Sequence, residues 1–153
     1  MAARETTLWD IPTRLFHWAI VLCVALSWWS AQEQRYSLHE NSGYAVIVLV
    51  VFRIIWGFAG SRHSRFKDFL VGPRKLDHYL RTGQYDSAGH NPLGGLSVVV
   101  LMLLLLLQAV SGLFNSDDIL FSGPLHFMAS TAVRDTMGQA HDLLFNLLLG
   151  FIA

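Results

Sequence analysis

Four long apolar stretches, separated by polar segments, dominate the pattern of the chain. They lie at about residues 14–31, 39–60, 91–114 and 137–153. A helix needs roughly 20 mostly apolar residues to cross the hydrocarbon core of a bilayer, and the first three stretches meet that length. The fourth is still apolar at Ala153, so we expect a helix that is cut short in this sequence. The pattern predicts an all-α fold, a transmembrane four-helix bundle formed by a single domain over residues 1–153.

The composition of the chain argues against a soluble domain. Hydrophobic residues make up 53% of the chain and charged residues 14%, whereas a soluble domain carries about 25% charged residues. The formal net charge is zero, which gives no reason to expect a nucleic-acid partner. We therefore expect membrane lipid to surround the protein.

The positive charges predict the orientation, because lysine and arginine are enriched in cytoplasmic loops. The segment 61–90 holds six of the eleven Lys and Arg residues: Arg62, Arg65, Lys67, Arg74, Lys75 and Arg81. The loops near Arg35 and Arg134 hold one each. The N-terminus and segment 61–90 are thus expected inside, with the other two loops outside. Apolar residues at helical spacing between the charges predict that 61–90 is an amphipathic cytoplasmic segment lying on the membrane surface.

Histidines are the candidate functional residues, since ionisable groups inside a membrane are costly and seldom without a role. His39 and His141 lie at the outer starts of the second and fourth helices, and His17 lies near the inner end of the first. Two histidines at one depth on different helices can bind one haem iron from opposite sides through neutral imidazole nitrogens. An iron with both axial positions filled carries electrons and has no open site for a substrate. A transition-metal site or a proton relay is the alternative for these three residues.

One stripe of the second helix supports a cofactor. His39, Gly43 and Arg53 lie on it, because helical residues three or four positions apart share a face. Gly43 leaves room for a flat macrocycle or for a neighbouring helix. Arg53 lies about 21 Å from His39 along the axis, at about 1.5 Å per residue. It either binds an anion such as a haem propionate near the inner face, with Arg14 beside it, or extends to the inner interface.

Five motifs stand out along the chain: P-x-R-x-x-H-W at 12–18, H-x-x-x-G at 39–43, F-R-x-x-W-G at 52–57, H-N-P-x-G-G at 90–95 and H-D at 141–142. Together they resemble the bacterial cytochrome b561 family and the b-type cytochrome subunits of nickel–iron hydrogenases. The resemblance implies four helices and two b-type haems, each bound by two histidines. It assigns His39 and His141 to the outer haem and His17 to the inner haem. The family's partner for His17 falls near position 155, beyond the last residue of this sequence, and His90 is a weaker substitute.

The implied function is that of a membrane-bound b-type cytochrome in the bacterial inner membrane. It would transfer electrons between the quinone pool and a periplasmic c-type cytochrome or hydrogenase, as an electron-transfer protein or as a subunit of a quinone oxidoreductase. A homodimer is allowed but not required. Two other functions stay open at this point: a haem-free membrane anchor subunit and a histidine-lined cation transporter.

Overall fold

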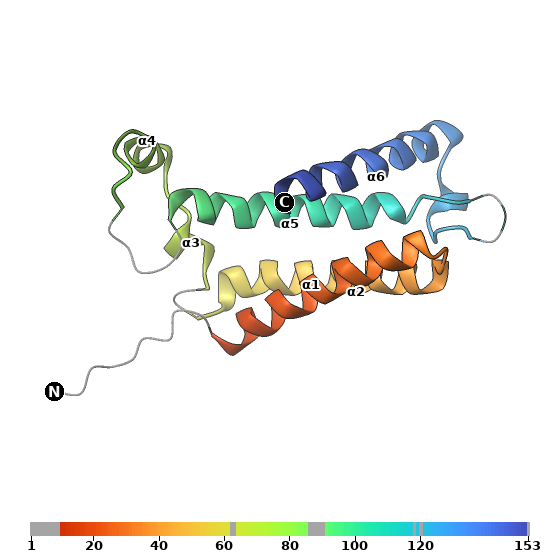
Figure 1. The fold of residues 1–153 in the computed structure, drawn as a ribbon, viewed down its shortest axis with the longest axis horizontal. Coiled ribbons are helices and arrows are strands. Elements are labelled where there is room, and N and C mark those ends of the chain that lie inside the picture. Colours follow the sequence, from red (N-terminus) through yellow and green to blue (C-terminus); the bar gives the residue numbers. More distant parts are fainter. Residues whose placement is uncertain (1–9, 62–63, 86–90, 118, 120, 153) are drawn as a thin grey trace.

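The chain forms two helical hairpins that lie side by side (Figure 1). The computed structural model describes residues 10–61, 64–85, 91–117, 119 and 121–152. Helices α1 (Ile11–Gln32) and α2 (Tyr36–Ala59) form the first hairpin, and α5 (Pro92–Gly112) and α6 (Thr131–Ile152) form the second. Helix α2 packs against α5 and so joins the two hairpins. This arrangement is the all-α membrane helical bundle predicted from the sequence.

Three of the described helices, α1, α2 and α5, are long and apolar enough to cross a membrane. Helix α6 has 22 residues, but Arg134, Asp135 and Asp142 make its first half more polar. It begins at Thr131, well before the apolar stretch expected from residue 137. The other expected ranges overlap α1, α2 and α5 and differ from them by only a few residues at each end.

Local sequence signals determine where the helices begin and end. The Asp10 side chain caps α1 by accepting a hydrogen bond from the backbone N–H of Thr13 at 2.9 Å. Asn91 caps α5 in the same way, through Gly94 at 2.7 Å. A proline follows each cap in the first turn, where its missing N–H costs nothing. The starts of α1 and α5 both lie at the end of the molecule that holds the segment between the hairpins (Figure 1).

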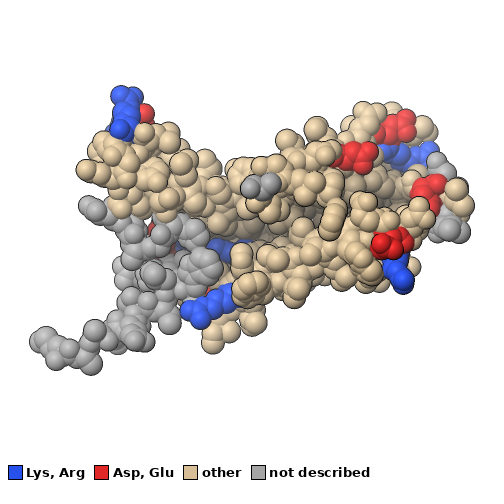
Figure 2. All heavy atoms as spheres, in the orientation of Figure 1, with Lys and Arg blue, Asp and Glu red and all other residues tan. Residues whose placement is uncertain are grey.

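The small core lies where α1, α2 and α5 meet. Its buried members are Ile20, Val46, Val50 and Met102. Many other large apolar side chains point outward, which suits a protein whose surroundings are lipid. Charged side chains lie toward both ends of the face drawn in Figure 2, and its middle is mostly uncharged.

Two short helices, α3 (Phe66–Phe69) and α4 (Pro73–Thr82), lie at the end opposite the hairpin turns (Figure 1). The ring of Phe66 packs directly on Gly57, where a Cβ atom would overlap it. The carbonyl oxygen of Phe69 lies 2.7 Å from the position of a Cβ at Gly95. Glycines in α2 and α5 therefore let α3 sit tightly against this end of the bundle, which the charge pattern predicts to be the inner end.

Candidate functional site

The structure brings His39 and His141 together at the end that holds both hairpin turns. His39 lies in the first turns of α2 and His141 lies in α6. Their ring centroids are 6.2 Å apart, and the ring planes meet at 75°. Two residues that are far apart in the sequence, one from each hairpin, therefore face each other at one level of the bundle.

The hydrogen bonds of His39 define which of its nitrogens carries the proton. Nδ1 of His39 lies 2.9 Å from the backbone carbonyl oxygen of Ser27 in α1. A carbonyl oxygen only accepts hydrogen bonds, so Nδ1 must be the donor. The hydroxyl oxygen of Ser27, 3.2 Å from the same nitrogen, then accepts as well. In the neutral ring this leaves Nε2 with a free lone pair that can bind a metal.

His141 is held in the same way by the other hairpin. Its Nδ1 donates to the carbonyl oxygen of Gln108 in α5 at 2.9 Å and lies 3.1 Å from the hydroxyl of Ser111. Gly112 allows this approach, because a Cβ there would lie 3.0 Å from Cε1 of the ring. Both imidazoles are thus oriented through Nδ1 by the neighbouring helix, as metal-binding histidines usually are.

The spacing of the rings fits one metal ion between them. A metal–imidazole bond is about 2 Å long and the ring nitrogen lies about 1.1 Å from the ring centroid, so two imidazoles on opposite sides of one ion have centroids about 6.2 Å apart. The observed separation is 6.2 Å. Opposed axial ligands need not have parallel ring planes, so the 75° angle is compatible with this arrangement.

The two imidazoles supply only part of a coordination sphere. Within the described residues, no group of three or more His, Cys, Asp or Glu side chains comes close enough to bind a metal ion. A site built from protein side chains alone normally uses three or four such ligands. Two opposed imidazoles suit an iron whose remaining ligands come from a flat macrocycle. Gly43 lies one turn after His39, and a Cβ added there would meet no described atom within 4 Å apart from its own stretch of α2, so it leaves open space beside the pair.

The other predicted histidines are not part of this pair. His17 has an exposed side chain, and its ring meets that of Trp18 edge-on at 5.7 Å. It lies on α1 about 15 Å along the axis from Ser27, at about 1.5 Å per residue. Arg14, one turn earlier on α1, is also exposed. His90 lies outside the described residues.

Arg53 is buried at the inner end of the bundle, against α3. Only 4% of the residue is exposed. Its guanidinium carbon lies 5.3 Å from the centroid of the Phe66 ring and 5.9 Å from that of Phe69. Its Nη1 is buried without a hydrogen-bond partner among the described residues. A buried guanidinium N–H without an acceptor is costly, so the position favours an anion.

Asp10 joins the inner ends of α1 and α2, a role that the sequence analysis missed. Its carboxylate accepts hydrogen bonds from Trp56 Nε1 at 2.9 Å and from the Ser61 hydroxyl at 2.6 Å, besides the cap to Thr13. Burial raises the pKa of this carboxyl group, but the hydrogen bonds from Ser61, Thr13 and Trp56 outweigh burial and bring the pKa well below 3.8. Asp10 therefore stays ionised in the folded protein at neutral pH.

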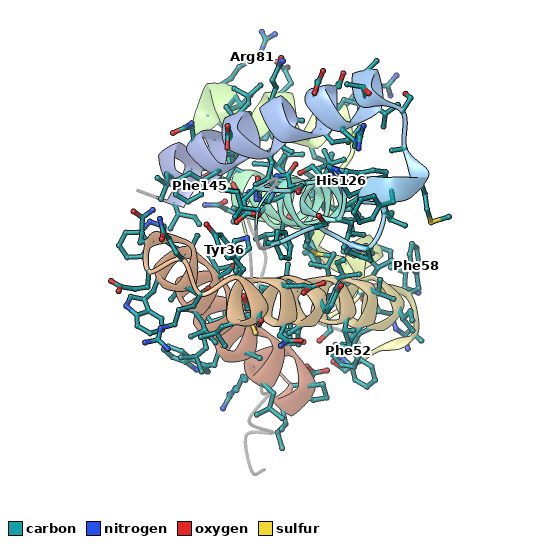
Figure 3. The ribbon with its side chains drawn as sticks, turned by 90° about the vertical axis from the view of Figure 1, so that its right-hand side faces the viewer. Tyr36, Phe52, Phe58, Arg81, His126 and Phe145 are labelled. Carbon is teal, nitrogen blue, oxygen red and sulfur yellow. The ribbon has the colours of Figure 1, made fainter. Side chains whose placement is uncertain are left out.

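His126 is buried in the loop between α5 and α6. Its Nδ1 donates to the Phe114 carbonyl oxygen at 2.9 Å, and Arg134 Nη1 donates to its Nε2 at 2.9 Å. Nearby, Tyr36 stacks on Phe121 with ring centroids 5.8 Å apart. Figure 3 shows Tyr36 between the hairpins and His126 beside the end of α5. These contacts hold the outer loop against the bundle and give His126 a structural role.

The serine hydroxyl groups beside the two histidines were not predicted from the sequence. Ser30 donates its hydroxyl to the Ser27 carbonyl oxygen at 3.0 Å, and Ser111 donates to the Gln108 carbonyl oxygen at 2.9 Å. In both hairpins, the hydroxyl group thus comes three residues after the carbonyl that accepts from the histidine. This shared spacing, of polar residues within an otherwise apolar helix, is the one signal that the sequence offered for them.

Comparison with known proteins relates the chain to b-type cytochromes. The family model of the prokaryotic cytochrome b561 matches residues 8–153. The curated relatives include the probable Ni/Fe-hydrogenase 1 B-type cytochrome subunits of Escherichia coli K12 and O157:H7. Each is 24% identical to this chain over an alignment that covers 69% of the chain and 57% of the relative. The chain thus spans little more than half the length of these relatives. No solved structure matches it.

The family match covers nearly all of the chain and includes both histidines of the pair. Together with the three long apolar helices, it identifies a multi-pass membrane protein that belongs to the prokaryotic cytochrome b561 family.

Proposed function

We propose that this protein is a membrane-bound b-type cytochrome that transfers electrons between the quinone pool and a periplasmic redox partner. One observation carries the proposal. The rings of His39 and His141, from separate hairpins, lie at the centroid distance of 6.2 Å that suits two axial ligands of one iron. The family match supports a b-type haem as the group between them.

The haem would be held by the outer ends of both hairpins. Nε2 of His39 and Nε2 of His141 would hold the iron, while each Nδ1–H would stay bonded to a carbonyl oxygen of α1 or α5. Gly43 would provide open space for the macrocycle beside His39. When bound, haem supplies reversible one-electron transfer at its iron. With both histidines holding the iron, substrates and oxygen would be kept away from the metal.

A second haem at the inner end is the further part of the proposal. His17 would bind it, with a second ligand beyond residue 153 or, as a weaker choice, His90. The buried Arg53, whose Nη1 has no hydrogen-bond partner in the part of the chain that the structure describes, would bind a propionate of this haem, and Arg14 would lie beside it. The levels of His39 and Arg53 are about 21 Å apart along α2, so an inner and an outer haem both fit within a membrane core of roughly 30 Å.

The proposed setting follows from the charges and from the relatives. The basic segment 61–90 favours an orientation with the N-terminus and the inner haem on the cytoplasmic side of a bacterial inner membrane. The outer haem then faces the periplasm. The relatives named as hydrogenase cytochrome subunits favour a periplasmic hydrogenase as the redox partner, with a c-type cytochrome as the second choice. Quinone is the partner within the membrane. A homodimer is compatible with this arrangement, as is a role as a subunit of a quinone oxidoreductase.

A haem spectrum of the purified full-length protein tests this function. We expect the sharp α and Soret bands of a low-spin b-type haem in the reduced-minus-oxidised spectrum, and the reduced bands should appear when quinol is added to the protein in vesicles. A protein that is purified intact but shows no haem bands would instead be a membrane anchor subunit or a cation transporter. Haem bands that quinol never reduces would reject the quinone pool as electron donor.

A further inference from the structure

Two serine hydroxyls act on the hydrogen bond that orients His39. We propose that Ser27 and Ser30 are positioning residues that shift the reduction potential of the outer haem in opposite directions. The inference rests on the proposed function, because it concerns the haem held by His39 and His141. Neither serine would touch the iron; both act through Nδ1 of His39.

The carbonyl oxygen of Ser27 is shared by two side-chain donors. It accepts from His39 Nδ1 at 2.9 Å and from the Ser30 hydroxyl at 3.0 Å. Ser30 is 0% exposed, so water does not replace its hydroxyl. Two donors that use one oxygen weaken each other, since each withdraws electron density from the lone pairs the other needs. The Ser30 hydroxyl therefore weakens the bond from His39 Nδ1–H to this carbonyl.

The Ser27 hydroxyl acts on the same N–H with the opposite sign. Its oxygen lies 3.2 Å from Nδ1 of His39 and accepts from it, which adds to the pull of the carbonyl. A stronger acceptor at Nδ1 makes an imidazole a stronger electron donor to the metal. A stronger donor stabilises ferric iron more than ferrous iron and so lowers the reduction potential. Ser27 thus lowers the potential, and Ser30 raises it.

The second hairpin combines both effects in one residue. The Ser111 oxygen accepts from His141 Nδ1 at 3.1 Å, while its proton is donated to the Gln108 carbonyl oxygen at 2.9 Å. Removal of this hydroxyl takes away one acceptor for Nδ1–H but frees the carbonyl to accept more strongly. The two changes oppose each other, so Ser111→Ala should shift the potential less than either serine variant of α1.

Redox titration of the full-length protein, with the outer haem identified as the one that His39→Ala removes, tests the inference. We expect Ser27→Ala to raise the midpoint potential and Ser30→Ala to lower it. At a fixed potential, each should change the ratio of reduced to oxidised haem roughly threefold, as expected for one weakened hydrogen bond. Ser27→Thr keeps the hydroxyl and should retain the wild-type potential.

Ser97→Ala is the matched control, because the Ser97 hydroxyl donates to the Leu93 carbonyl oxygen at 2.9 Å in an exposed part of α5. If Ser30→Ala does not retain haem, Ser30→Cys, a weaker donor of similar size, takes its place with the same expected fall. Shifts in the same direction for the Ser27 and Ser30 variants, or none in a protein that keeps its haem, would overturn the inference alone. Wild-type protein without haem would overturn both the inference and the proposed function.

Discussion

At the outer end of the bundle, His39 and His141 face each other and each is anchored by a carbonyl oxygen of the neighbouring helix. At the inner end, His17 is exposed, and Arg53 is buried beneath α3 with an Nη1 that has no hydrogen-bond partner among the described residues. The outer end therefore has two facing histidines, the proposed haem ligands, together with the groups that orient them. The inner end has a buried cation and one proposed histidine ligand.

The difference teaches what a haem site in a helical bundle requires. A ligand pair needs two helices that present histidines at one level, and each ring needs an acceptor for Nδ1–H so that Nε2 faces the metal. His39 and His141 have both: their rings face each other near the hairpin turns, and the neighbouring helix of each hairpin supplies a carbonyl oxygen for Nδ1–H. A cation such as Arg53 can mark where an anionic group binds, but it does not orient an imidazole.

The largest effect should come from the outer histidines themselves. His39→Ala and His141→Ala should each remove nearly all of the same haem, because an iron between two imidazoles loses an axial ligand in either variant. The reduced-minus-oxidised spectrum measures this loss. His78→Ala, on the exposed face of α4, is the control and should keep the wild-type spectrum. Loss of different haems in the two variants would break the proposed pairing.

The space beside His39 gives the next test. Gly43→Leu should lower the haem content strongly while the helical circular dichroism stays the same, because the side chain would occupy space that the macrocycle needs. Gly150→Leu is matched to it: a Cβ at either glycine has no atom within 4 Å, yet Gly150 is exposed in α6, away from the pair. Equal haem content in these two variants would show that the macrocycle does not lie against Gly43.

Substitution of Arg53 should affect the two ends of the bundle differently. Arg53→Gln removes a positive charge near the proposed inner haem, so ferric iron there should be stabilised relative to ferrous iron by an amount on the order of 1 kcal/mol. The midpoint potential of that haem should therefore fall. The outer haem, about 21 Å away along α2, should be nearly unaffected. Redox titration measures the midpoint potentials of the two haems separately. The exposed Arg81→Gln serves as control. Equal shifts of both haems would contradict the assignment of Arg53 to the inner end.

The smallest effect concerns stability at the inner end. Asp10→Ala should lower the free energy of unfolding by about 1–2 kcal/mol, as expected for loss of an N-cap, and thermal unfolding in detergent measures it. Because folding lowers the pKa of Asp10 below 3.8, its contribution is present above pH 3.8 and is lost as the pH falls toward the folded value. The difference between wild type and Asp10→Ala should therefore shrink in acid.

Asp77→Ala is the control for this prediction, because its ion pair with Arg81 is exposed and contributes little. A stability difference that grows as the pH falls would contradict the role given to Asp10.

Much of the outer site could be predicted from the sequence, because it depends on depth along helices. The apolar pattern predicted the helices. Because the second and the fourth helix both start at the outer end, the pattern also predicted that His39 and His141 lie at one level. The start of α6 at Thr131 was not predicted, since Arg134 and Asp135 interrupt the apolar pattern while α6 still packs on α5. A polar helical turn outside the membrane carries no hydrophobic signal.

The supporting groups could not be predicted, for a different physical reason. The acceptors for His39 and His141 are backbone carbonyl oxygens of Ser27 and Gln108, and every residue has such a group. Which carbonyl accepts depends on how the two helices pack. The burial of Arg53 likewise depends on α3 folding back onto Gly57. The sequence left open whether Arg53 binds an anion or extends to the inner interface.

Electron paramagnetic resonance of the oxidised full-length protein tests the central claim most directly, since it reports the ligands of ferric iron. We predict a strongly anisotropic low-spin signal for the wild type, as two imidazoles with steeply inclined planes produce, and its disappearance in both His39→Ala and His141→Ala. A low-spin spectrum in either variant that is the same as that of the wild type would contradict the assignment of this iron to His39 and His141.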